Sequence, residues 1–249
     1  MNGNLNSCSV SVSSANIYPQ INEADESYTL SIAADGTCKI ESNEIWGAMH
    51  AMETFTQLLE RNIETKQVFT TYAPATVKDS PRFPHRGLMI DTSRHYLTVS
   101  AIKKMIDILP MSKFNTLHIH LVDAQSFPFD SPSAPEIVKG AYSSKLTYTQ
   151  KDLMLITEYA AERGVRMIFE IDVPGHAASW NAGYPKVMAD CFEKYSYNIN
   201  DFALNPAVDD TYTVLNAVLG DLVKATNSSL VHIGGDEVVY GYFSVGAAN

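Results

Sequence analysis

The sequence predicts an α/β protein in which a small α+β domain, residues 1–78, precedes the first four β/α units of a (β/α)8 TIM-type barrel, residues 79–249. In the second part strand and helix patterns alternate four times, the strand patterns are almost continuously apolar, and each ends at an acidic residue. Such strands are typical of a parallel sheet covered by helices. In a barrel their C-terminal ends meet at the active site. A doubly wound open sheet is the alternative, although no glycine-rich phosphate loop follows any strand.

The first domain is predicted to pack one helix on a small sheet. Residues 8–13 alternate as in a half-buried strand, and residues 28–32 and 37–40 flank a turn at Gly36, which is the pattern of a hairpin. Asn43 is the expected N-cap of a helix. The apolar residues behind it recur at helical spacing and predict its buried face: Ile45, Ala48, Met49, Met52, Phe55, Leu58 and Leu59.

A proline-rich boundary separates the two parts, because three prolines between residues 74 and 84 resist both a helix and a central strand. Helices are then expected from the N-cap Ser100 to Met111, from the N-cap Thr149 to a stop at Gly164, and after Pro206 to about residue 226. The predicted strands are residues 87–90, 114–122, 165–171 and 230–233, which end at Asp91, Asp123, Asp172 and the pair Asp236 and Glu237.

Composition excludes several classes of function. The formal net charge of −10 and the lack of a basic run argue against a nucleic-acid partner, which would need clustered Lys and Arg. No segment has the roughly 18 uncharged apolar residues of a membrane span, and this chain shows no secretory signal peptide. Cys8, Cys38 and Cys191 fit no metal-site spacing, so we expect buried or free thiols.

The adjacent carboxylates Asp236 and Glu237 are the strongest chemical signal. Two carboxylates at one turn can keep one of them protonated near neutral pH, which makes it a general acid. Gly234 and Gly235 allow the tight backbone that such a turn requires. Taken alone, the same four residues also fit a solvated acidic turn after a strand.

Four motifs in order resemble glycoside hydrolase family 20, the β-N-acetylhexosaminidases. HIGGDEV at residues 232–238 is similar to the signature of that family, and FPHRGLMIDTSRHYL at residues 83–97 is similar to its first barrel strand and the following loop. NTLHIHLVD at residues 115–123 and DVPGH at residues 172–176 are similar to the second and third strands. The first domain resembles the small domain that precedes the barrel in this family.

The resemblance implies a retaining, substrate-assisted mechanism without a cofactor or metal. Glu237 would protonate the glycosidic oxygen and later activate water, while Asp236 would orient the 2-acetamido group whose oxygen attacks the anomeric carbon. The intermediate would be an oxazolinium ion, an exception to the scheme with a carboxylate nucleophile. Arg94 would bind sugar hydroxyls, a task that suits a guanidinium group. His176 and Asp123 would form a hydrogen-bonded relay behind Glu237.

Two other interpretations stay open. His118 and His120 lie on the strand face opposite Asp123 by simple alternation, and we expect satisfied interior histidines there. A metal-dependent barrel hydrolase would instead use them with His176 and His232 as zinc ligands. Because the chain ends at Asn249, we expect it to lack barrel strands five to eight. We therefore expect little activity, and the alternative is a non-catalytic, self-associating half-barrel.

The expected partners are glycans that end in β-linked N-acetylglucosamine or N-acetylgalactosamine. The resemblance also implies a lysosomal or secreted glycoprotein and a homodimer as one form of assembly. Asn227-Ser228-Ser229 is a glycosylation sequon, which matters only in an exported chain.

Overall fold

The structure is a computed structural model that describes residues 5–14, 24–189 and 198–239. The chain divides into two compact units. One comprises the described parts of Met1–Arg86 with Asp107–Asn115 and Arg163–Val165. The other comprises Gly87–Ile106, Thr116–Glu162 and the described parts of Arg166–Asn249. No helix in the described ranges is long and apolar enough to cross a membrane.

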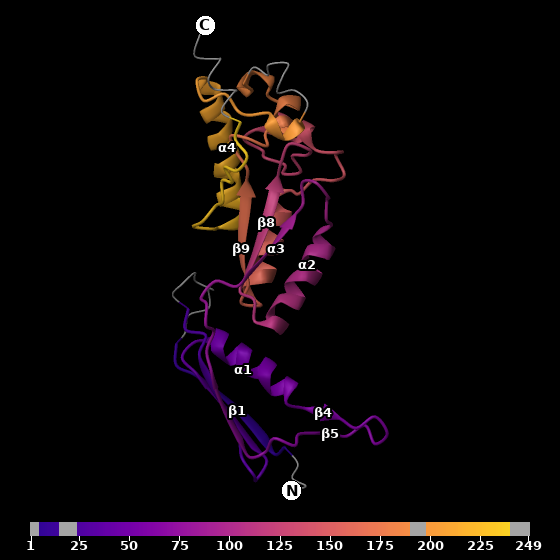
Figure 1. The fold of residues 1–249 in the computed structure, drawn as a ribbon, viewed down its shortest axis with the longest axis vertical. Helices are drawn as coiled ribbons and strands as arrows, with labels where there is room; N and C mark the ends of the chain where they lie inside the picture. The colour runs from indigo at the N-terminus through magenta and orange to yellow at the C-terminus, as the bar shows by residue number, and fades with distance from the viewer. Residues whose placement is uncertain (1–4, 15–23, 190–197, 240–249) are drawn as a thin grey trace. The chain divides into compact units, whose positions relative to one another are not determined.

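The first unit is a four-stranded sheet with one helix packed on it (Figure 1). Strand β1 (Ser7–Val12) pairs in parallel with β3 (Thr37–Ser42), and β2 (Tyr28–Ile32) pairs antiparallel with β3 and β6 (Ala75–Asp79). The helix α1 spans Ile45–Gln57. Its side chains and the inner face of β2 and β3 form a core of Tyr28, Leu30, Ile32, Cys38, Ile40, Ala48 and Ala51.

Several details of this unit differ from the prediction. The first strand is an exposed edge strand rather than a half-buried one, and only Val12 packs against the core. Glu44, not Asn43, occupies the N-cap position of α1. The strand β6 lies inside the proline-rich stretch, which is possible because an edge strand tolerates neighbouring prolines.

The prediction of buried or free thiols is wrong for two cysteines. Cys8 and Cys38 are direct partners in the register of β1 and β3, and they form a disulfide. Register brings together residues that lie 30 positions apart, which sequence spacing alone does not reveal. Cys191 lies outside the described residues.

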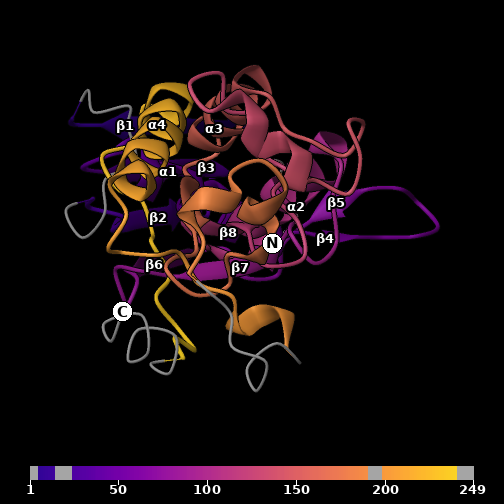
Figure 2. The same ribbon diagram turned by 90° about the horizontal axis from the view of Figure 1, so that it is seen from above.

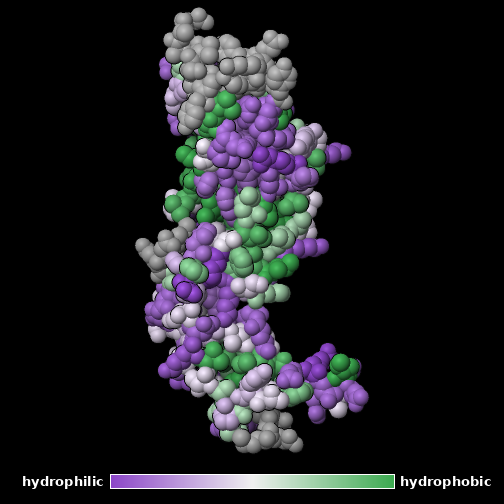
Figure 3. Space-filling model, in the orientation of Figure 1, coloured by the Kyte–Doolittle hydropathy of each residue, from purple (hydrophilic) through white to green (hydrophobic). Residues whose placement is uncertain are grey.

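A two-stranded hairpin extends from the first unit (Figure 1). Its strands are β4 (Glu60–Arg61) and β5 (Val68–Phe69). Ile63 in the turn is 81% exposed, and Figure 3 shows hydrophobic residues among hydrophilic ones on this hairpin.

The second unit has a three-stranded parallel sheet in the order β7 (Gly87–Asp91), β8 (Thr116–Val122) and β9 (Arg166–Ile171). The predicted fourth strand at residues 230–233 forms only an isolated bridge, which pairs His232 with Glu170 in parallel. Backbone hydrogen bonds nevertheless join this segment to β9: the N–H of His232 donates to the carbonyl of Phe169, and the N–H of Ile171 donates to the carbonyl of His232.

Helices cover this sheet, and the two that follow β8 and β9 lie side by side (Figure 1, Figure 2). Thr149 caps α3 (Gln150–Ala161) as predicted, in a capping box with Asp152. Thr98 rather than Ser100 precedes α2 (Val99–Ile108), and its Oγ1 accepts from the N–H of Ala101. The last helix, α4, spans Asp209–Thr226. Short 3-10 turns occupy Leu109–Ser112, Pro135–Gly140, Ala178–Ala182, Pro185–Val187 and Ile199–Asp201.

Candidate active site

The structure brings the five predicted site residues into one polar network at the C-terminal ends of the parallel strands. Asp123 follows β8 and contacts both Arg94 and His176. His176 in turn faces Asp236 and Glu237. These side chains converge because the strands are parallel and therefore end at the same edge of the sheet.

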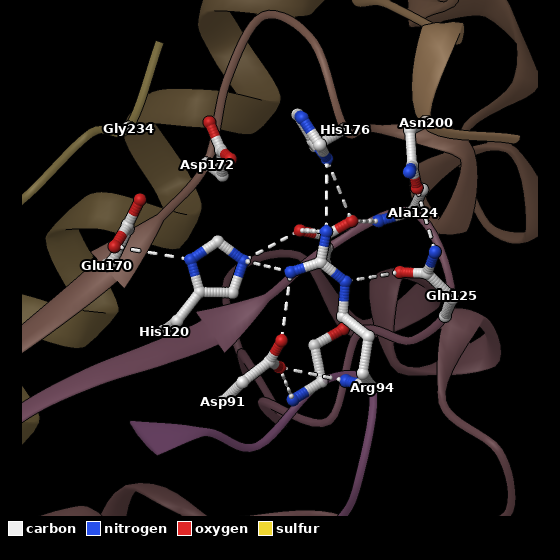
Figure 4. A network of polar contacts seen from close by, with 12 residues as sticks. Asp91, Arg94, His120, Ala124, Gln125, Glu170, Asp172, His176, Asn200 and Gly234 are labelled. Atoms are coloured by element: carbon white, nitrogen blue, oxygen red, sulfur yellow. Dashed lines mark hydrogen bonds and ion pairs between the residues drawn. The ribbon is translucent and has the colours of Figure 1, made fainter. Parts of the chain in front are cut away.

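Asp123 is the buried centre of this network, and Figure 4 shows three of its neighbours, Arg94, His120 and His176, whose side chains point toward one another. Asp123 is 1% exposed, and its carboxylate accepts from Nε2 of His120 at 2.7 Å and from Nδ1 of His176 at 3.1 Å. Nη2 of Arg94 lies 2.8 Å from its Oδ2. Burial alone raises the pKa of Asp123, but the hydrogen bonds and these charges lower it overall. The group is therefore an anion that holds its neighbours in place.

Arg94 is fixed from three sides. Its Nη1 donates to Oδ2 of Asp91 at 2.8 Å, and its Nε donates to Oε1 of Gln125 at 2.9 Å. Gln125 is itself anchored, because its Nε2 donates to Oδ1 of Asn200. The Arg94 side chain remains 33% exposed, so its guanidinium can still meet a ligand.

His120 is the first residue for which simple alternation gave a wrong prediction. It was expected to face away from Asp123, but the two side chains share a hydrogen bond. The cause is an irregular register between His120 and Val122, since a bulge shifts the alternation of side chains along a strand. His118 is only partly buried, with 23% of its side chain exposed, and its Nε2 lies 2.5 Å from Oε2 of Glu170.

His176 connects the buried centre to the two exposed carboxylates. Its side chain is 2% exposed, and its backbone has a positive φ of 53° after Gly175. Nε2 lies 3.3 Å from Oε2 of Glu237 and 3.7 Å from Oδ2 of Asp236. These two side chains are 71% and 64% exposed, so both face solvent at the end of the sheet.

The turn that carries the acidic pair needs its glycines. Gly234 and Gly235 have φ values of 61° and 103°, which favour glycine. A Cβ on Gly234 would lie 2.0 Å from Oδ1 of Asp172. The same Oδ1 accepts the N–H of Gly235 at 2.9 Å, so Asp172 holds the turn against the end of β9.

The sequence predicted Asp172 at the end of a strand but did not indicate that its side chain is fully buried. Burial, with Asp236 nearby, raises its pKa to about 7. Its Oδ2 is buried and makes no hydrogen bond within the described residues. Asp172 is thus the buried carboxyl of this site whose pKa is raised, whereas Asp236 and Glu237 are exposed.

We expect Asp172→Asn to flatten the pH dependence of stability. A free aspartic carboxyl has a pKa near 3.8 and the folded one about 7, so between these values the folded chain binds more protons and stability falls as pH rises. The loss of unfolding free energy from pH 5 to pH 8 should be smaller in the variant by about 1–3 kcal/mol. Urea titrations of both proteins measure it, and equal slopes would contradict the assignment.

Three histidines surround Glu170 on the inner side of the sheet. His118, His120 and His232 each place a ring nitrogen within 3.3 Å of its carboxylate. Burial raises the pKa of Glu170, but these histidines lower it well below its usual range. Ligand atoms of His118, Glu170 and His232 lie within 4.8 Å of one another, a set that could hold a cation. The contacts between the ionised Glu170 and its three histidine partners explain this cluster without a bound cation.

Comparisons with known proteins agree on one family. Residues 83–247 match the family described as glycosyl hydrolase family 20, catalytic domain, and residues 1–58 match a domain described as beta-acetyl hexosaminidase like. Beta-hexosaminidase 3 of Arabidopsis thaliana is 42% identical over 86% of this chain and 39% of its own length. The beta-hexosaminidase subunit beta of Homo sapiens is 39% identical over 92% of this chain and 40% of its own length.

Solved structures give the same result. The chitobiase of Flavobacterium johnsoniae has a TM-score of 0.84 at 31% identity, over 96% of this chain and 35% of that one. A β-N-acetylglucosaminidase of Vibrio harveyi in complex with N-acetylglucosamine has a TM-score of 0.77 at 28% identity, over 97% and 40%. The chain spans about two fifths of the length of the curated relatives that it matches.

Proposed function

The chain belongs to glycoside hydrolase family 20, and we propose that it carries the acid/base half of a β-N-acetylhexosaminidase active site. The substrates would be glycans with a terminal non-reducing N-acetylglucosamine or N-acetylgalactosamine. The series Asp123–His176–Glu237 is the observation that supports this proposal. Nδ1 of His176 binds the carboxylate of Asp123 at 3.1 Å, and its Nε2 lies 3.3 Å from the exposed carboxyl group of Glu237.

The proposed reaction has two steps. In the first, the acetamido oxygen of the substrate, oriented by Asp236, attacks the anomeric carbon while Glu237 gives its proton to the departing glycosidic oxygen. An oxazolinium ion results. In the second, Glu237 takes a proton from water, the oxygen of that water bonds to the anomeric carbon, and the oxazolinium ring opens. Two adjacent carboxylates cannot straddle a sugar ring, which supports the substrate's own acetamide as nucleophile.

Arg94 supplies the proposed sugar contact. Asp91, Asp123 and Gln125 fix its orientation, and the exposed part of its guanidinium group lies beside the relay. A group fixed in this way loses little conformational freedom when it binds hydroxyls.

We also propose that β7, β8, β9 and residues 230–233 are the first four strands of a (β/α)8 barrel, and that residues 1–78 are a separate domain before it. The hydrogen bonds from residues 230–233 to β9 support the fourth strand. Export to the lysosome or the cell exterior is a further proposal. The Cys8–Cys38 disulfide supports it, since disulfides persist mainly in oxidising compartments. The homodimer stays a prediction.

Release of 4-nitrophenol tests the proposed activity. The β-N-acetylglucosaminide and β-N-acetylgalactosaminide should be cleaved, whereas the β-glucoside, which lacks the acetamide, should not. We expect slow turnover from the 249-residue chain by itself, because Asp236 and Glu237 are mostly exposed and water is not excluded from them. Equal rates on the glucoside would contradict a substrate-assisted mechanism.

The same preparation distinguishes the alternatives. Sedimentation at several concentrations detects a self-associating half-barrel, which would be favoured if the chain neither cleaves these substrates nor binds N-acetylglucosamine. Stoichiometric zinc in the purified chain, lost together with activity on chelation, would favour the metal-dependent hydrolase.

A further inference from the structure

A second row of charges lies behind Asp123, in residues that the proposed mechanism does not use. Glu170, on β9, is 5% exposed, and His120, on β8, is 6% exposed. Oε2 of Glu170 lies 3.2 Å from Nδ1 of His120 (Figure 4), and Nε2 of His120 lies 2.7 Å from Oδ2 of Asp123. The histidine therefore bridges two buried carboxylates on different segments.

Glu170 and His120 are connected to the proposed relay through Asp123. Asp123 binds Nδ1 of His176 through its other oxygen, and Nε2 of His176 faces Glu237. We propose that Glu170 and His120 are positioning residues that hold Asp123 in the orientation in which it binds His176. The inference rests on the proposed function, because it adds Glu170 and His120 to the relay that is proposed to serve Glu237.

The positive charge of His120 explains how its ring can bind both Asp123 and Glu170. Burial by itself lowers its pKa, but the hydrogen bonds and charges of Asp123 and Glu170 raise it to about 10. Two other titratable or charged groups lie close to the ring in the described residues. Nη1 of Arg94 lies 3.4 Å from Nε2, and a carboxylate oxygen of Asp172 lies within 4.8 Å of a ring nitrogen. A protonated ring donates from both nitrogens, whereas a neutral ring donates from one. Hydrogen bonds to an ionised partner are roughly twice as strong as neutral ones.

Glu170 is well placed to orient His120 because it is itself held from two directions. Nε2 of His118 lies 2.5 Å from its Oε2, and Nδ1 of His232 lies 3.3 Å from its Oε1. One partner comes from β8 and the other from the segment joined to β9. The irregular register at the end of β8 then turns His120 and Asp123 toward each other.

The test is nuclear magnetic resonance of the whole chain with labelled histidines, and it requires no turnover. The variant is Glu170→Gln, which keeps the shape of the side chain and removes its charge. The matched control is Glu136→Gln, which removes a carboxylate from an exposed ion pair with Lys139. Two signals are followed: the titration of the His120 ring, and the exchange with water of the ring N–H of His176 that binds Asp123. His176→Gln identifies the second signal.

In the wild type and in Glu136→Gln, His120 should titrate near pH 10 and the His176 N–H should exchange slowly. In Glu170→Gln the His120 midpoint should fall by at least about two pH units, and exchange of the His176 N–H should accelerate about tenfold. A fall of the His120 midpoint with unchanged exchange at His176 would overturn the proposal, since Glu170 would then act on His120 alone.

A second variant guards against misfolding. If Glu170→Gln does not fold, His120→Gln should accelerate exchange at His176 with Glu170 intact, and a wild-type exchange rate there would refute the inference. Loss of folding in both variants would replace the positioning role by a purely structural one. Failure of the chain to cleave N-acetylhexosaminides would count against the proposed function and leave this test unaffected.

Discussion

Glu237→Gln is expected to lower kcat by about 10²–10⁴-fold on N-acetylglucosaminides with an alkyl leaving group, which is the range for loss of a general acid or base. The amide keeps the size of the side chain but cannot give a proton to the departing oxygen. The loss of kcat/KM, which reports the first step, should be about tenfold or less when the leaving group is a dinitrophenolate, because that anion departs without a proton. On that substrate kcat itself should still fall, because Glu237 also takes the proton from water in the second step. Measuring both substrates side by side separates a proton-transfer role from a binding role.

The matched control is Glu136→Gln, which makes the same change in an exposed ion pair and should leave both rates unaltered. An equal loss of kcat/KM on both leaving groups would show that Glu237 is not the acid of the first step. Unchanged rates on both would remove it from the mechanism altogether.

The sequence could predict the position of the site because two of its signals are local. The apolar runs before Asp91, Asp123 and Asp172 each mark a strand, buried in β8 and mostly buried in β9 but half-exposed in the edge strand β7, and parallel strands must end at one edge. The positive φ values of Gly234 and Gly235 likewise follow from a tight turn directly after a strand. These features depend on neighbours in the chain, so their pattern is visible without coordinates.

The remaining features depend on register or on burial, which local patterns do not contain. His120 faces Asp123 only because the register between β8 and β9 is irregular, and alternation alone places it on the other side. The Cys8–Cys38 disulfide requires a parallel pairing across 30 residues. The raised pKa of Asp172 arises mainly from burial, which no motif at residues 172–176 reveals.

Asp123→Asn should lower the free energy of unfolding by about 3–5 kcal/mol at pH 7, because it removes the anion from a buried ion pair and leaves its partners behind. Arg94 and the protonated His120 both lose their shared carboxylate, and asparagine offers one acceptor oxygen in its place. The matched control is Asp107→Asn, which breaks an aspartate–arginine pair with Arg163 whose side chains are 45% and 29% exposed. That change should cost less than about 1 kcal/mol.

The pH dependence of the stability difference between wild type and Asp123→Asn tests whether the charge of Asp123 causes it. The pKa of Asp123 is lowered in the folded chain, so the stability that its charge contributes is present above the unfolded pKa near 3.8 and is lost as pH falls through the folded value. The gap between wild type and Asp123→Asn, measured by urea titration, should therefore shrink as the pH is lowered below about 4. A gap that stays constant down to pH 2 would mean that the lost stability comes from packing rather than charge. A gap of under about 1 kcal/mol at pH 7 would show that Asp123 does not organise the network around it.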